Sequence, residues 1–240
     1  MTGFLASVDN IEDAITVCNH GADIIDLKNP SQGALGGLTL NDIHTIVDHI
    51  WEKSIVSATI GDIEADLPLI LKKIQQVADT GVDYVKVGMF SKQHIQECLP
   101  RFEYPTHRGI KIIAVLFADI DFDVLDAVKA CRKARLAGVM MDTVGKSEGN
   151  LLSYRSPKEL NQFVQTAQNL GLLTGLAGSL REKDIDTLLP IQPDYIGFRT
   201  ALCKDLVRTN PVSKRSVVNI HNKFKNSSDK PIMHNSIYAF

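Results

Sequence analysis

Eight short apolar runs recur along the chain, and each is followed by an amphipathic stretch or by a loop that leads to one. Short apolar runs are typical of buried strands, and apolar residues spaced three or four apart are typical of helices, so the alternation predicts repeated strand–helix units. The expected strands lie at residues 3–8, 23–27, 55–60, 84–87, 111–117, 138–141, 172–177 and 195–198. The expected helices lie at residues 11–20, 40–51, 67–80, 92–99, 123–136, 157–170, 183–189 and 212–225.

The connections between these elements favour one closed barrel. Three helices lead into the next strand through similar glycine-containing phrases, at residues 20–23, 80–83 and 136–139, and a glycine just after a helix is a C-cap signal. Strands joined through helices are parallel, with right-handed crossovers. Eight such units in 240 residues match an α/β protein of the (β/α)8 or TIM-barrel type, with a closed eight-stranded parallel sheet, better than an open doubly wound sheet.

We expect a single (β/α)8 domain at residues 1–225 and a polar C-terminal tail at residues 226–240. The tail begins with polar, turn-like residues and ends with apolar ones, so it docks on the barrel or on a neighbouring subunit, or it stays mobile. A homo-oligomer is therefore one of the open alternatives.

Composition and charge exclude several classes of protein. The formal net charge of -2 gives no reason to expect a nucleic acid or an anionic membrane as a partner. No apolar run is long enough to span a membrane, and the N-terminus lacks the basic region of a secretory signal. The four cysteines and seven histidines are scattered without disulfide or metal-ligand spacing, and no G-x-G-x-x-G follows the first strand. We therefore expect a cytoplasmic protein that uses neither a metal nor another cofactor.

The second expected strand ends with two opposite charges. Asp26 and Lys28 are two residues apart, so in a strand their side chains point to the same face. Burying such a pair is costly unless a site uses it, although an ordinary ion pair at a strand end is the alternative. Pro30 ends the strand, because proline cannot donate to a ladder, and a glycine-rich loop follows.

The carboxyl ends of the strands carry the active site of a (β/α)8 barrel, so the polar residues there are the candidates for function. Beyond Asp26 and Lys28, the candidates in chain order are Ser57, Thr59, Lys86, Asp142, Lys146, Gly178, Ser179, Gly197 and Arg199.

Lys28 and Lys86 are the informative pair. Two ammonium groups at one barrel mouth repel each other, and burial disfavours the charged form, so the pKa of one of the amines should fall until part of it is neutral near pH 7. A neutral amine can attack a carbonyl carbon and form an imine, while Asp26 or Asp142 holds the other lysine charged and shuttles protons. The alternative for either lysine is a side chain whose tip reaches solvent.

The ends of the last two strands favour an anion. The backbone N–H groups around Gly178, Ser179 and Gly197, together with the forked cation of Arg199, are donors of the kind that bind phosphate in such barrels. The alternative is a tight turn in which Ser179 caps a helix.

Five phrases of the sequence, taken in order, resemble the (5-formylfuran-3-yl)methyl phosphate synthase family, also called 4-(hydroxymethyl)-2-furancarboxaldehyde-phosphate synthase. They lie at residues 21–36, 56–62, 83–88, 142–146 and 176–179, and they include the unusual strings D-x-K-N-P and S-A-T-I-G-D. The resemblance implies a lyase that condenses two molecules of glyceraldehyde 3-phosphate into a phosphorylated furan aldehyde, with release of phosphate and water, for methanofuran-type one-carbon carriers. It implies Lys28 as the lysine that forms the Schiff base and Lys86 as an acid–base residue. Lys146, Asp26 and Asp142 would support them, and Ser57 and Thr59 would contact the substrate.

Two other classes stay as alternatives. A Schiff-base class I aldolase could act on another phosphorylated sugar, but many such barrels carry their lysine on the sixth strand, where this chain has Asp142, with Lys146 four residues on. A non-catalytic barrel that binds a phosphorylated ligand is allowed by the fold alone. Lysines and carboxylates at one mouth count against it, because binding needs no neutral amine.

Overall fold

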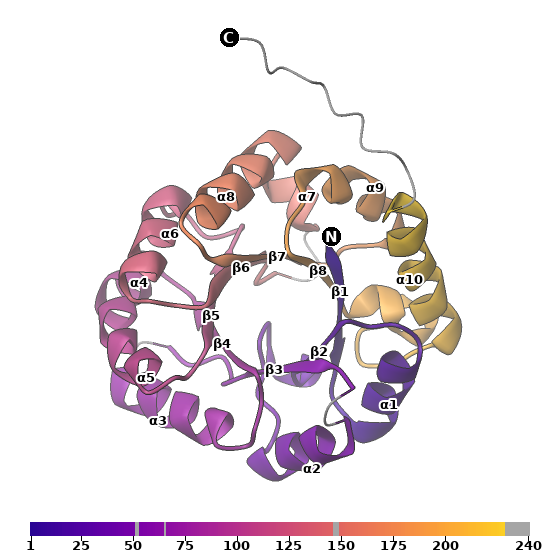
Figure 1. The fold of residues 1–240 in the computed structure, drawn as a ribbon, viewed down its shortest axis with the longest axis horizontal. Coiled ribbons are helices and arrows are strands. Elements are labelled where there is room, and N and C mark those ends of the chain that lie inside the picture. Colours follow the sequence, from indigo (N-terminus) through magenta and orange to yellow (C-terminus); the bar gives the residue numbers. More distant parts are fainter. Residues whose placement is uncertain (51–52, 65, 146–148, 229–240) are drawn as a thin grey trace.

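Eight parallel strands close into a barrel in the computed structural model, which describes residues 1–50, 53–64, 66–145 and 149–228. Each strand pairs with the next one along the chain, and β8 pairs with β1, so the sheet has no free edge (Figure 1). The strands are β1 (Gly3–Val8), β2 (Ile24–Leu27), β3 (Ile55–Thr59), β4 (Tyr84–Met89), β5 (Ile112–Phe117), β6 (Gly138–Asp142), β7 (Leu173–Leu176) and β8 (Tyr195–Phe198). The predicted (β/α)8 barrel is confirmed.

The helices form a ring around the barrel (Figure 1). They are α1 (Ile11–Asn19), α2 (Leu40–Ile50), α3 (Leu67–Ala78), α4 (Lys92–Cys98), α5 (Glu103–His107), α6 (Val124–Lys133), α7 (Leu151–Tyr154), α8 (Pro157–Asn169), α9 (Ile185–Leu188) and α10 (Lys214–Ser228). Several begin at caps carried by the sequence: Asn10, Asp123 and Ser156 each accept a hydrogen bond from a backbone N–H three residues on. α5 and α7 lie outside the predicted helices, because such short helices hold too little of the apolar repeat to be recognised.

One predicted helix cap is wrong. Gly21 and Gly81 follow α1 and α3 with φ of 97° and 89°, as expected of glycines that end helices. Gly138 instead begins β6, and Arg135, with φ of 58°, makes the left-handed turn after α6. A side chain at position 138 would press against the backbone of Leu173 on β7, so this glycine serves the close approach of two strands.

Two apolar layers hold the barrel together, one between the sheet and the helices and one inside the sheet. The inner layer is built from Leu5, Ala34, Leu35, Ile113, Val115, Phe117, Met140, Ala177 and Tyr195. Polar side chains interrupt it around β2, where the parallel register sets Ser7, Asp26 and Ser57 beside one another on β1, β2 and β3. Because alternate residues of a barrel strand point inward, this register brings three polar side chains into an apolar interior.

The last helix, α10, ends at Ser228, three residues past the predicted domain boundary at residue 225. The rest of the predicted tail, residues 229–240, lies outside the described residues, and so does the docking expected of it. Within the described part of the chain, every helix is too short or too polar to cross a bilayer.

Candidate active site

Asp26 is the centre of the polar cluster inside the barrel. Its carboxylate accepts hydrogen bonds from the hydroxyls of Ser7 and Ser57, at 2.9 and 2.7 Å. Its Oδ1 also lies 2.9 Å from Nζ of Lys86, in an ion pair whose two side chains are each 2% exposed. Burial alone would raise the pKa of Asp26, but the charges of Lys86 and Lys28, together with hydrogen bonds from Lys86 and Ser57, outweigh burial and hold the pKa below its ordinary value of 3.8.

Lys86 lies deeper than a residue of the barrel mouth. It is the third residue of β4, and the strand continues past it to Met89. Its Nζ lies 5.6 Å from the centre of the Tyr195 ring, in addition to its ion pair with Asp26. Burial lowers the pKa of Lys86 below its ordinary value of 10.5, while the charge of Asp26 opposes this shift and that of Lys28 adds to it. Lys86 is therefore an amine that gives up its proton more readily than an exposed lysine.

The low pKa of Asp26 predicts that this carboxylate stabilises the fold only above acidic pH. As the pH falls, the carboxyl of the unfolded chain takes up a proton first, while the folded chain keeps it charged to lower pH. The stabilisation is complete above the unfolded pKa and is lost as the pH falls through the folded one. We expect the free energy of unfolding, measured in urea, to fall more steeply for the wild type than for Asp26→Asn between about pH 5 and pH 3. Parallel curves for the two proteins would contradict this.

Lys28 lies at the mouth and faces a second carboxylate. Its Nζ is 3.8 Å from Oδ2 of Asp142, the last residue of β6, and both side chains are buried. β2 and β6 stand on opposite sides of the ring, so the two side chains meet across the barrel (Figure 1). The other carboxylate oxygen of Asp142 accepts a hydrogen bond from the backbone N–H of Thr143 at 2.7 Å. The structure thus brings together Lys28, Lys86 and both predicted aspartates, which come from three strands or their ends, β2, β4 and β6.

A small cavity opens at the carboxyl ends of the strands. Its volume is about 30 Å³, and Lys28 and Asp142 line it together with Gly178, Ser179 and Gly197 from the ends of β7 and β8. Gly178 and Ser179 have φ of 116° and 51°. A left-handed serine is a sparsely populated conformation of the kind that collects at ligand sites. The predicted imine-forming lysine and the predicted phosphate turn therefore border one space.

Ser57 and Thr59 contact other parts of the site instead of this cavity. Ser57 donates to Asp26, and the Thr59 hydroxyl donates to the backbone oxygen of Gly36 at 3.0 Å, which ties the loop after β2 to β3. These contacts position the carboxylate and the loop, and the expected contact of both residues with substrate stays a prediction. The predicted contribution of Lys146 lies outside the described residues.

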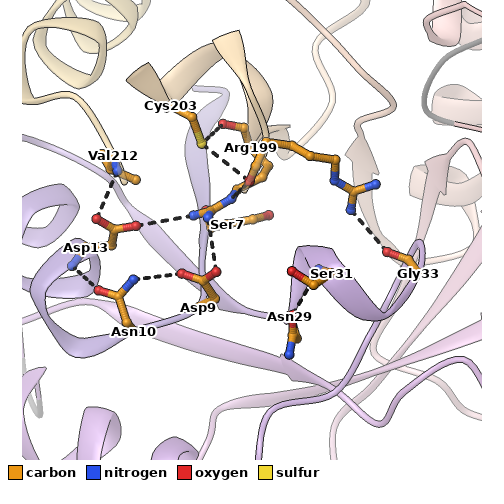
Figure 2. A network of polar contacts seen from close by, with 11 residues as sticks. Ser7, Asp9, Asn10, Asp13, Asn29, Ser31, Gly33, Arg199, Cys203 and Val212 are labelled. Atoms are coloured by element: carbon orange, nitrogen blue, oxygen red, sulfur yellow. Dashed lines mark hydrogen bonds and ion pairs between the residues drawn. The ribbon is translucent and has the colours of Figure 1, made fainter. Parts of the chain in front are cut away.

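Arg199 has its guanidinium occupied by the protein (Figure 2). Its Nη2 lies 3.2 Å from the carboxylate of Asp9, and its Nη1 lies 3.5 Å from that of Asp13. Nη1 also donates to the backbone oxygen of Ser7, and Nε donates to that of Arg208 at 2.8 Å. Arg199 lines the mouth cavity, but these contacts fasten the end of β8 to β1 and α1. Its predicted role in phosphate binding stays untested, and its contacts favour a structural one.

Arg208 is a candidate that the sequence does not reveal. It lines the mouth cavity with Lys28, Gly178 and Ser179, and its side chain is partly buried. It follows β8 by ten residues and belongs to no predicted strand or helix, so nothing in its neighbourhood along the chain separates it from other arginines. Only the folded loop shows that it reaches the mouth.

A larger cavity, of about 380 Å³, opens at the amino ends of the strands. Tyr84, Asp194 and Tyr195 line it, and it reaches Ser57 and Lys86 from below. Burial raises the pKa of Tyr195 far above its ordinary range, so its hydroxyl stays protonated. This cavity lacks Lys28 and the turn after β7, so the smaller cavity at the mouth is the better candidate for the reaction despite its size.

Comparisons with a family model and with individual relatives point to the same family. A family model described as 4-HFC-P synthase matches residues 4–221. A protein of Methylorubrum extorquens is 36% identical over 83% of this chain and 82% of its own. The (5-formylfuran-3-yl)methyl phosphate synthases of Methanopyrus kandleri and Methanocaldococcus jannaschii are each 31% identical, over 83% and 89% of this chain and 89% and 95% of their own.

Solved structures of other enzymes share the barrel. Phosphoribosyl anthranilate isomerase from Thermus thermophilus aligns with a TM-score of 0.66 at 10% identity, over 95% of this chain and all of its own. 3-Hexulose-6-phosphate synthase from Salmonella typhimurium aligns with a TM-score of 0.63 at 16% identity, over 92% of this chain and 99% of its own. At such identities the likeness concerns the fold alone.

Proposed function

The chain belongs to the 4-HFC-P synthase family, and from this membership we propose that it condenses two molecules of glyceraldehyde 3-phosphate into (5-formylfuran-3-yl)methyl phosphate, with release of phosphate and water. The product would serve the biosynthesis of a methanofuran-type cofactor. The observation that carries this proposal is the pairing of two buried lysines with two carboxylates, one pair at the mouth and one beneath it.

Lys28 is the nucleophile in this proposal. Its side chain lines the mouth cavity beside Gly178 and Ser179, whereas Lys86 lies below that cavity. A triose phosphate held at the turn after β7 would place its carbonyl carbon within reach of the Lys28 amine, which attacks and loses water to form an imine. Asp142, 3.8 Å from Nζ, is positioned to accept and return the protons of these steps.

Lys86 and Asp26 supply the next proton transfers. An imine makes the neighbouring C–H acidic, and removal of that proton gives an enamine that can expel phosphate or attack the second aldehyde. A base for this step works best when its pKa lies near the working pH, and burial moves the pKa of Lys86 in that direction. Asp26 holds the Lys86 amine in one place at 2.9 Å.

The reaction would take place in the cytoplasm. Cys18, Cys98, Cys131 and Cys203 are all unpaired, as is usual for proteins of a reducing compartment.

The test is product analysis with glyceraldehyde 3-phosphate as the only substrate. We expect a furan aldehyde that absorbs in the near ultraviolet, together with released inorganic phosphate and a product mass that fits the loss of phosphate and water. A plain aldol product does not absorb there, and its appearance would favour the Schiff-base aldolase. No turnover, and no gain in protein mass after sodium borohydride treatment with the substrate, would favour the non-catalytic phosphate-binding barrel.

A further inference from the structure

The loop after β8 carries a cation to the barrel mouth. Arg208 donates from Nη2 to the backbone oxygen of Gly33 at 3.1 Å, a contact between residues 175 positions apart. Gly33 belongs to the loop after β2, just past Lys28. Asp62 accepts hydrogen bonds from the N–H groups of Ala34 and Leu35 in the same loop. The guanidinium of Arg208 therefore joins the loop that follows β8 to the anchored loop that follows the lysine strand.

Arg208 is held firmly by its backbone and loosely by its side chain. Its backbone oxygen accepts from Nε of Arg199 at 2.8 Å, and Arg199 is itself tied to Asp9 and Asp13. The guanidinium of Arg208, in contrast, makes a single hydrogen bond among the described residues, to Gly33. Because Arg208 lines the mouth cavity, its remaining N–H donors are available to a ligand there, while its backbone stays in place.

The same loop contains strained backbone. Asp205 and Leu206 both have φ of 55°, in the left-handed region that disfavours non-glycine residues. An antiparallel bridge between Cys203 and Val212 closes the base of the loop, and the Val212 N–H donates to Asp13. Two adjacent strained residues persist only where surrounding contacts impose them, and here those contacts deliver Arg208 to the mouth.

The mouth cavity is small, with a volume of about 30 Å³, and Arg208 lies on its rim. Among the described residues, the guanidinium of Arg208 is held by a hydrogen bond to a backbone carbonyl, at 3.1 Å. Exchange of that bond for one to a ligand in the cavity therefore leaves no charged partner of Arg208 unpaired in this part of the chain.

We propose that Arg208 is the cation that binds the substrate phosphate over the Gly178–Ser179 turn, and that it exchanges its hydrogen bond with Gly33 for bonds to phosphate oxygens. A guanidinium can offer two parallel N–H donors to a phosphate, which a lysine cannot. The role of Arg199 is then to position the backbone of Arg208. This proposal rests on the proposed function, because it takes the ligand to be a triose phosphate.

The test measures phosphate binding apart from the chemistry. Glycerol 3-phosphate resembles the substrate but has no carbonyl group, so it cannot form an imine with Lys28. We expect Arg208→Gln to weaken its binding, measured by titration calorimetry, by roughly tenfold to a hundredfold, the loss typical of hydrogen bonds to a charged group. Arg208→Lys should fall between wild type and Arg208→Gln. Arg132→Gln, which removes an exposed arginine charge from α6, should stay within about twofold of wild type.

Each outcome separates the two proposals. The role of Arg208 is overturned if a folded Arg208→Gln protein binds glycerol 3-phosphate within about twofold of the wild-type affinity. This holds even if the protein still makes furan. Undetectable binding of glycerol 3-phosphate by the wild type overturns it as well. If the wild type makes no furan but Arg208→Gln weakens glycerol 3-phosphate binding, the phosphate site stands and the proposed function fails. With active enzyme, Arg208→Gln should raise KM for glyceraldehyde 3-phosphate more than it lowers kcat, because a clamp on a distant phosphate binds ground and transition states alike.

Discussion

Arginine in place of Lys28 is expected to abolish furan formation while leaving the fold intact. A guanidinium keeps the positive charge opposite Asp142, so the ion pair across the mouth can persist. It stays protonated at any working pH and cannot form the productive imine, so turnover should fall by a factor on the order of a thousand or more. The loss is measured by the near-ultraviolet absorbance of the product, and thermal unfolding checks the fold.

Borohydride trapping identifies the nucleophile directly. Treatment of the wild type with glyceraldehyde 3-phosphate and sodium borohydride should leave a reduced adduct that peptide mapping finds on Lys28, and Lys28→Arg should show none. Lys129→Arg is the matched control, because Lys129 is an exposed lysine on α6 whose partner, Asp126, lies on the same helix. An adduct on Lys86 would exchange the roles of the two lysines. Furan formation without an adduct on any lysine would rule out the imine mechanism.

Local patterns in the sequence are enough to predict the fold and part of the candidate site. Side chains two apart on a strand share a face, so the spacing of Asp26 and Lys28 is enough to place them together. Closure of the barrel then brings Asp142 to Lys28, since strand ends of one ring converge. The meeting of these two residues follows from periodicity and topology alone.

The direction and depth of side chains could not be predicted in the same way. The sequence places Arg199 at a strand end but does not say that Asp9 and Asp13, near the other end of the chain, take up its donors. The sequence places Lys86 on β4, but it does not show how far below the mouth Lys86 lies, because that depth depends on how the strands are staggered. Arg208 lies in an irregular loop without periodicity, and its position depends on contacts with the backbone of Gly33 and with Arg199. Long-range contacts of this kind leave no local pattern.

Methionine in place of Lys86 should lower both turnover and stability, because one residue serves proton transfer and charge balance. Removal of a general acid–base group typically costs about a hundredfold to ten-thousandfold in kcat. The same change leaves Asp26 buried with only the hydroxyls of Ser7 and Ser57 as hydrogen-bond partners among the described residues. Breaking a buried ion pair in this way costs about 3–5 kcal/mol.

A double-mutant cycle separates the two effects. Asp26→Asn combined with Lys86→Met removes both charges, so its free energy of unfolding in urea should exceed that of Lys86→Met alone, since no unpaired carboxylate is then buried. Its kcat should stay low, because the proton-transfer group is still absent. Borohydride should still trap substrate on Lys28 in Lys86→Met, since imine formation belongs to the mouth. A Lys86→Met protein that kept kcat within about threefold of wild type would show that Lys86 only balances the charge of Asp26, and the proton transfers would then pass to Asp142.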